Sequence, residues 1–116
     1  MPLLKIETSA PLNDDRQVER VLQESSRIVA DLLHKPEQYV MVALSPVAML
    51  MSAAGGPAAF CDLRSIGGIE PDACQALSQA LCALLETTLQ IAPERIYLNF
   101  AEFDAASWGW NGTTFG

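Results

Sequence analysis

Basic residues are scarce in this 116-residue chain, and that scarcity excludes one class of function. Seven Lys and Arg stand against fourteen Asp and Glu, which gives a formal net charge of −7. No basic run occurs that could neutralise successive phosphates, so nucleic-acid binding is not expected. The longest nearly apolar stretch, residues 40–51, contains Ser45 and Pro46 and is far shorter than the roughly 20 residues of a membrane helix. The first residues also lack the charged and apolar blocks of a signal peptide.

Cysteine and histidine are scarce as well, and their spacing excludes further classes of site. The three cysteines stand at positions 61, 74 and 82 without a C-x-x-C pair, and His34 is the only histidine. An odd, scattered set argues against a disulfide framework, and a single histidine near a helix end predicts no metal site. We therefore expect no metal and no cofactor. Reduced cysteines and the lack of a targeting segment make the cytoplasm the default expectation for localisation.

Length and composition predict one domain spanning residues 1–116. Half of the residues are hydrophobic and only 18% are charged, compared with about 25% in a typical soluble domain. This composition argues against disorder. It also indicates that a partner, most simply another copy of the chain, covers part of the apolar surface.

Apolar periodicity predicts the same order of elements twice. Residues 2–8 alternate as a strand, apolar positions from Val18 have helical spacing up to Pro36, and the nearly continuous apolar run 39–44 predicts a strand buried on both faces. The second half predicts strands over 58–66 and 95–103 around a helix that begins at Pro71 and extends to 89. Similar junctions, 57 residues apart, precede the last strand of each half: Lys35-Pro36-Glu37 and Ala92-Pro93-Glu94.

This order indicates an α/β (α+β) fold built from two βαβ units, about residues 1–56 and 57–116. Two crossovers give a four-stranded mixed sheet with both helices on one face, and the aromatic tail 107–116 adds short C-terminal strands. Because the strands look apolar in both directions, we expect the uncovered face to pack against other copies in a homotrimer or dimer.

Position 2 carries a candidate for unusual chemistry. Removal of Met1 would leave Pro2 as a secondary amine, and an α-amino group has a reference pKa of about 7.7 to 8. Burial or a nearby cation lowers that pKa, which makes the amine a general base at neutral pH. Met-Pro is a common start, so the dipeptide alone is weak. No catalytic serine, P-loop or dinucleotide motif is present. The cations in or beside the predicted strands, apart from Arg95, are Lys5, Lys35 and Arg64.

Several segments, in this order and nearly end to end, resemble the macrophage migration inhibitory factor family of the tautomerase superfamily. They are Met1-Pro2-Leu3, Lys35-Pro36-Glu37-Gln38-Tyr39-Val40, Leu63-Arg64-Ser65-Ile66-Gly67, Leu81-Cys82-Ala83-Leu84-Leu85, residues 93–100 and residues 108–115. Each segment alone is weak evidence. Their common order along one small domain is specific.

The resemblance implies a fold, an assembly and a reaction. The fold is two βαβ units, and the assembly is a homotrimer with sheets facing inward and active sites at the subunit interfaces. The reaction, which needs no cofactor, moves a proton between carbon and oxygen of a small aromatic α-keto acid such as phenylpyruvate, or of dopachrome. By the resemblance Pro2 is the catalytic base. The implied substrate-binding residues are Lys35 for the carboxylate, the backbone of Ile66 with Ser65 beside it, Tyr97 and Asn99 from a neighbouring subunit, the aromatic wall of Tyr39, Trp110 and Phe115, and Trp108 at the pocket mouth.

Three positions depart from the family pattern. Residues 58–61 keep only the second cysteine of a C-x-x-C, so dithiol redox activity is not expected. Arg64 stands in place of a histidine and Trp108 in place of a smaller aliphatic residue, which leaves substrate preference open. A second interpretation stays open beside the enzyme: a cytokine-like, protein-binding signalling ligand with a vestigial pocket, exported without a leader as in relatives. A purely structural trimer is a third.

Overall fold

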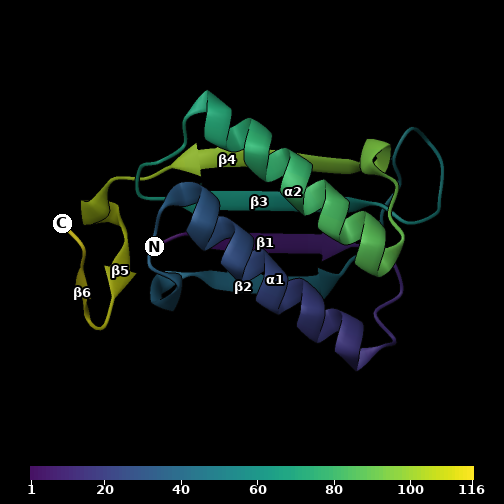
Figure 1. The fold of residues 1–116 in the computed structure, drawn as a ribbon, viewed down its shortest axis with the longest axis horizontal. Helices are drawn as coiled ribbons and strands as arrows, with labels where there is room; N and C mark the ends of the chain where they lie inside the picture. The colour runs from purple at the N-terminus through teal and green to yellow at the C-terminus, as the bar shows by residue number, and fades with distance from the viewer.

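The computed structural model describes all of residues 1–116 and contains one four-stranded mixed sheet (Figure 1). The strands lie in the order β2 (Met41–Pro46), β1 (Leu3–Thr8), β3 (Ala59–Ser65), β4 (Ile96–Glu102). β1 is parallel to β2 and antiparallel to β3, and β3 is parallel to β4. Helices α1 (Asp15–Leu33) and α2 (Pro71–Leu89) lie side by side across one face. The predicted fold class is confirmed.

Short elements complete the chain. Single 3-10 turns precede or follow the strands, and a small two-stranded hairpin lies near the carboxyl end. They are η1 (Glu37–Tyr39), η2 (Pro93–Arg95), η3 (Ala105–Ser107), β5 (Gly109–Trp110) and β6 (Thr113–Thr114). Figure 1 shows this hairpin beyond the sheet, at the same end as the amino terminus.

Both helices begin and end at residues suited to those positions. The Asp14 carboxylate accepts a hydrogen bond from the Arg16 amide at 2.9 Å and so caps α1. Pro71 is the first residue of α2, where its missing N–H leaves no helical bond unmade. The residues that cap the carboxyl ends of the helices, His34 and Gln90, have left-handed φ values of 54° and 55°. This conformation turns the chain back toward the sheet after each helix.

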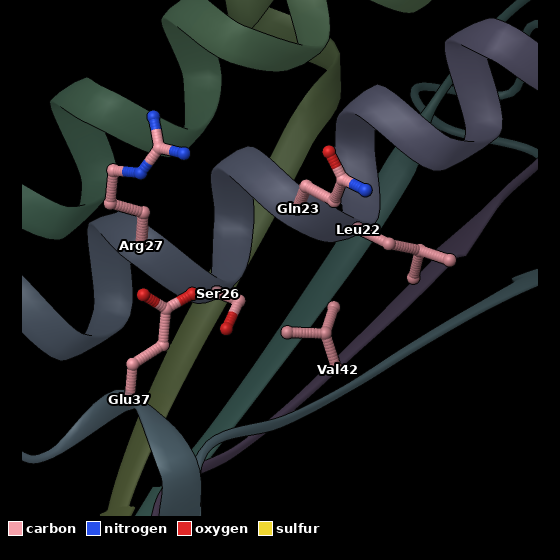
Figure 2. A pocket seen from close by; sticks show the side chains of 6 residues that line it. All are labelled: Leu22, Gln23, Ser26, Arg27, Glu37 and Val42. Carbon is pink, nitrogen blue, oxygen red and sulfur yellow. The ribbon is translucent and has the colours of Figure 1, made fainter.

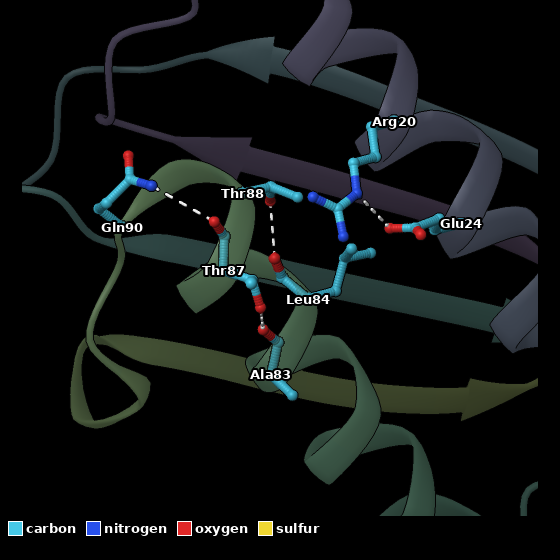
Figure 3. A network of polar contacts seen from close by, with 7 residues as sticks. All are labelled: Arg20, Glu24, Ala83, Leu84, Thr87, Thr88 and Gln90. Carbon is cyan, nitrogen blue, oxygen red and sulfur yellow. Dashed lines mark hydrogen bonds and ion pairs between the residues drawn. The ribbon is translucent and has the colours of Figure 1, made fainter.

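Two threonines in the last turn of α2 satisfy their hydroxyls within the helix (Figure 3). The Thr88 hydroxyl is buried and donates to the Leu84 carbonyl at 2.6 Å, and the Thr87 hydroxyl donates in the same way to Ala83. The Gln90 amide group donates to the Thr87 carbonyl at 3.3 Å. Because the buried Thr88 hydroxyl finds a backbone partner, this turn of the helix can pack against the core.

The two halves repeat every 56 residues, which corrects the spacing inferred from the Pro-Glu junctions. The first residues of α1 and α2 are 15 and 71, and the last are 33 and 89, so both pairs differ by 56. The turns η1 and η2 begin at 37 and 93, again 56 apart. Pro36 therefore precedes its turn whereas Pro93 is the first residue of its own. The sequence match at 57 residues is one position out of step with the structural repeat.

The burial of β2 differs from the prediction. Residues 37–39 form the turn η1, so the strand begins at Met41 and not at Tyr39. β2 lies at the edge of the sheet, and its side chains away from the helices are exposed; Met41 is 66% exposed. Within one chain this strand is therefore buried on one face only.

The face of the sheet away from the helices is mixed in character, which corrects the expectation of strands apolar in both directions. The helix-side residues, such as Leu4, Ile6 and Leu63, form the core with α1 and α2. The opposite positions alternate with them and include a set of polar residues: Lys5, Glu7, Asp62, Arg64 and Asn99. A face of this kind suits specific polar contacts better than a continuous hydrophobic interface.

The three cysteines are unpaired, and the helices are not membrane spans. Cys61 is buried in the core, and this burial raises the pKa of its thiol to about 12. Cys74 and Cys82 are partly buried on α2. Neither helix combines the length and the apolar character needed to cross a bilayer.

Candidate functional site

One end of the sheet gathers segments that are distant in the sequence. β1 and β2 begin at this end because they are parallel, and β3 and β4 finish here because they run in the opposite direction. α1 ends and α2 begins here, and the β5–β6 hairpin lies beside them (Figure 1). We call this the amino-terminal end of the sheet. The aromatic tail thus lies next to the first residues of the chain.

A pocket of about 390 Å³ opens at this end. Pro2 is fully buried, and its carbonyl accepts a hydrogen bond from the Met41 amide at 3.1 Å, which fixes its backbone at the edge of the sheet. The pocket lining is largely apolar and consists of Met1, Pro2, Leu3, Gln38, Tyr39, Val40, Met41, Trp108, Gly109, Trp110 and Phe115. An apolar hollow around a few polar groups is the usual form of a small-molecule site.

Three aromatic rings form one wall of the pocket. Trp110 and Phe115 are stacked, with centroids 5.6 Å apart and an angle of 11° between their planes. Tyr39 meets both edge-on, at 5.9 Å and 6.1 Å. Trp110 and Phe115 are brought together by the β5–β6 hairpin, whose turn residues Asn111 and Gly112 have φ values of 52° and 79°. Asn-Gly is the preferred pair for such a turn, so the sequence specifies this wall locally.

Lys35 lies half-buried where α1 ends. Its Nζ donates a hydrogen bond to the Ile66 carbonyl at 2.8 Å. The turn after β3 makes room for this contact through Gly67 and Gly68, which have φ values of 72° and 83°. A Cβ on Gly68 would lie 3.8 Å from the Lys35 Cε and in a strained backbone conformation. The glycines thus let the chain turn closely around the lysine, and Lys35 and Ile66 come together.

The α-amine at this end is electrostatically perturbed. Burial, and secondly the positive charge of Lys35, lower the pKa of the Met1 amine below its ordinary value of 8.0. Lys35 is therefore near enough to act on an amine beside the pocket. A neutral amine next to a fixed cation can accept a proton from a bound anion.

Ser65 lies beside this group but does not line the pocket. Its side chain is fully buried on the helix side of the sheet, and its hydroxyl has no hydrogen-bond partner. Its carbonyl accepts a bond from the Phe103 amide at 2.9 Å. Ser65 therefore positions the segment that follows β4.

Tyr97 and Asn99 are not brought to the pocket within one chain. Tyr97 pairs in register with Phe60, and Phe60 with Glu7, which is four residues along β1 from Leu3. Four residues span roughly 13 Å of strand. Tyr97 is 68% exposed near the far end of the sheet.

Trp108 is half-buried and borders the pocket on the side of β4. Its ring meets Phe103 edge-on, with centroids 5.9 Å apart and an angle of 89° between planes. Phe103 and the pocket residues Gln38, Val40 and Met41 were not expected from the sequence as site residues. The signal for the latter was their position within two residues of Tyr39.

A second hollow, between α1 and β2, is slightly larger but chemically poorer (Figure 2). Its volume is about 440 Å³, and its lining is Leu22, Gln23, Ser26, Arg27, Glu37 and Val42. Most of these side chains are polar and come from the outer surface of the helix and the turn that follows it. It lacks an aromatic wall and lies away from the chain's α-amine, so the pocket at the amino-terminal end is the better candidate site.

Comparison with known proteins gives a consistent result over the whole chain. Residues 1–116 match the family model described as macrophage migration inhibitory factor (MIF). The chain is similar to the macrophage migration inhibitory factor of Meriones unguiculatus, with 38% identity over 99% of both chains, and to a homolog from Brugia malayi, with 35% identity over 100% of both. Among solved structures, a homologue from Prochlorococcus marinus has a TM-score of 0.92 and 39% identity over 98% of this chain and 99% of that one.

Proposed function

The chain belongs to the macrophage migration inhibitory factor family and has the tautomerase fold, and from that premise we propose that it is a cofactor-free keto-enol tautomerase. Its substrates are small aromatic α-keto acids of the phenylpyruvate type, with dopachrome as a second candidate. The observation that supports this proposal best is the placement of Pro2, which is buried at an aromatic-walled pocket. Lys35 does not line this pocket, but its positive charge acts on the adjoining α-amine.

In this mechanism Pro2 is the base once Met1 has been removed. The neutral secondary amine takes a proton from the carbon next to the keto group. The C–H electron pair becomes the new carbon–carbon double bond, and the carbonyl oxygen gains a proton to give the enol; ketonisation is the reverse. Lys35 binds the substrate carboxylate, and its charge keeps the amine neutral near pH 7, where a base is most effective.

The aromatic wall has a defined role in the proposal. Tyr39, Trp110 and Phe115 enclose the substrate ring and exclude water from the reacting carbon. An apolar wall also strengthens the attraction between Lys35 and the carboxylate, because the local dielectric falls when water leaves.

We further propose that the active unit is a homotrimer, in which a neighbouring chain supplies Tyr97 and Asn99. Both residues are exposed on the face that the helices leave uncovered, and neither lines the pocket of its own chain. The polar groups of that face give an inward-packed assembly its register. Sedimentation equilibrium tests this: a monomeric protein with full activity would contradict it.

The decisive experiment is a phenylpyruvate ketonisation assay on protein whose mass shows that Met1 is absent, run beside Pro2→Ala. We expect turnover by the first protein and a loss of about 10²- to 10⁴-fold in the variant, the usual contribution of a positioned acid–base group. Equal turnover by both would overturn the assignment of Pro2. The circular dichroism spectrum of the variant checks that it is folded.

A cytokine-like binding role is the second candidate. Large apolar side chains are exposed at both ends of the sheet, among them Leu50 at 74% and Trp110 at 52%. Such residues suit contact with a protein partner. If mass-verified protein has no turnover, this role becomes the stronger proposal.

A further inference from the structure

A further cavity, distinct from the groove of Figure 2, adjoins the candidate active site and is lined by Arg64. Its volume is about 300 Å³, and it shares Leu3, Trp108 and Gly109 with the pocket around Pro2. The rest of its lining is Arg64, Phe103 and Ser107. The two hollows are therefore adjacent, with these three residues between them.

Arg64 is placed close to Pro2 by the register of the sheet. It pairs across the antiparallel ladder with Leu3, the residue that follows Pro2. Its only hydrogen bond runs from Nη2 to the Asp62 carboxylate at 3.1 Å, and its side chain is 44% exposed. A guanidinium has five N–H donors, so within a single chain most of them have no protein partner.

The walls beside Arg64 are flat and aromatic. The Arg64 Cζ lies 5.9 Å from the centroid of the Phe103 ring, within the range of a cation–π contact. Phe103 in turn packs edge-on against Trp108. The cavity therefore offers planar apolar surface next to a planar cation, which together suit an aromatic ring that bears a carboxylate.

The charge around the two hollows favours anions, although the whole chain is acidic. Three of the seven basic residues, Lys5, Lys35 and Arg64, lie near this end, and Lys35 contacts Ile66 only two residues beyond Arg64. Two residues of strand span roughly 6 to 7 Å. The acidic group that faces Arg64 is Asp62, which also pairs in register with Lys5. Two separate cations thus border one composite site.

We propose that the Arg64 cavity is a second anion subsite, so that the preferred substrates are arylpyruvates that carry another carboxylate at the far end of the ring. This inference rests on the proposed function, because it assigns the α-keto carboxylate to Lys35 and the second carboxylate to Arg64. A substrate without the second charge leaves the free donors of Arg64 to water.

The test compares phenylpyruvate with 4-carboxyphenylpyruvate, which differ by one carboxylate. We expect kcat/KM to be about tenfold higher for the dianion, as for a charge-assisted hydrogen bond at a half-exposed arginine. Arg64→Gln should remove this preference, Arg64→Lys should keep part of it, and Asp62→Asn should increase it because a competing carboxylate is lost. The matched control is Arg27→Gln, on the remote groove of Figure 2, which should leave the ratio of the two substrates as it is.

A binding measurement separates failure of this inference from failure of the proposed function. Quenching of Trp108 and Trp110 fluorescence by each compound gives dissociation constants without turnover. Turnover of phenylpyruvate with no dianion preference, and no effect of Arg64→Gln on the ratio, overturns the subsite and leaves the tautomerase intact. Tighter, Arg64-dependent binding of the dianion without any turnover supports the subsite and removes the tautomerase. Neither turnover nor Arg64-dependent binding overturns both.

Discussion

The structural repeat gives the sheet two equivalent ends, yet the two have opposite characters. Residues 56 apart correspond, so Lys35 matches Ile91 and Tyr39 matches Arg95. At the amino-terminal end the helix is followed by a half-buried cation, and a pocket is open. At the other end the same position holds Ile91, which is fully buried in the core.

The cation at the far end, Arg95, is bound to backbone carbonyls of its own chain. The Arg95 guanidinium donates to four carbonyls of the loop between β2 and β3, at distances from 2.8 to 3.4 Å: those of Pro57, Ala54, Met51 and Gly56. Four of the five guanidinium N–H groups are thus bound to the loop, and the loop closes that end. Lys35 makes a single carbonyl contact, and Arg64 a single carboxylate contact. The two ends therefore differ in how many donors of their cations are bound within the chain. The candidate site lies at the end where most of these donors have no partner within the chain.

Placing a lysine at the corresponding position of the far end should have the largest effect on stability. In Ile91→Lys an ammonium group replaces a fully buried side chain of the hydrophobic core. We expect the free energy of unfolding at pH 7 to fall by about 3 to 5 kcal/mol, as for an unpaired buried charge. Urea unfolding measures this change. Ile91→Met, which conserves volume, should cost less than about 1.5 kcal/mol; comparable losses in both variants would show that shape, not charge, distinguishes the two ends.

The sequence predicted the elements at both ends but not their different roles. Periodicity located both helices, and the aromatic tail 107–116 predicted the short C-terminal strands that carry Trp110. Local pattern could not show that Tyr39 belongs to a 3-10 turn, because its apolar neighbours read as a continuous strand. It also missed Arg95, whose four partners lie in a loop some forty residues earlier in the sequence. Side chains that act across sheet registers are fixed by tertiary structure, and periodicity does not report them.

The candidate site also combines residues that the sequence pointed to with positions that only the tertiary structure fixes. Pro2 and Phe115 lie near opposite ends of the sequence, and no spacing rule links them; the family resemblance proposed their association, and the fold places both at one pocket. The resemblance grouped Ser65 with the site, whereas its side chain is buried on the other side of the sheet. Backbone position alone could not reveal which way that side chain points, since one residue of register reverses it.

Releasing the loop that Arg95 holds at the far end should have an intermediate effect on stability. Arg95→Met removes the donors that hold the loop, and we expect a loss of about 1.5 to 3 kcal/mol, the range for hydrogen bonds to a charged group. The amides of Met51 and Ala54, which bond to each other's carbonyls, should exchange faster with solvent, while the Met41 amide at the amino-terminal end keeps its protection. Arg20→Gln is the control, because its exposed pair with Glu24 (Figure 3) is worth only about 0.5 kcal/mol. Unchanged exchange in Arg95→Met would mean that the loop is closed by its own packing.

The smallest expected effect is electrostatic and tests whether Lys35 acts on the open end. In protein that retains Met1, Lys35→Gln removes one of the two causes that lower the pKa of the α-amine, so this pKa should rise toward 8.0 while burial keeps it below. The sign also fixes the pH dependence. An amine with a depressed pKa opposes folding when it is protonated, and this opposition disappears as the pH rises through 8.0. Stability should therefore increase with pH in that range, and less so in the variant.

NMR titration of the amine gives the pKa directly. Lys5→Gln, exposed on the uncovered face of the sheet, should not move it; an equal shift in both variants would assign the effect to net charge, and the two ends would then differ in shape alone.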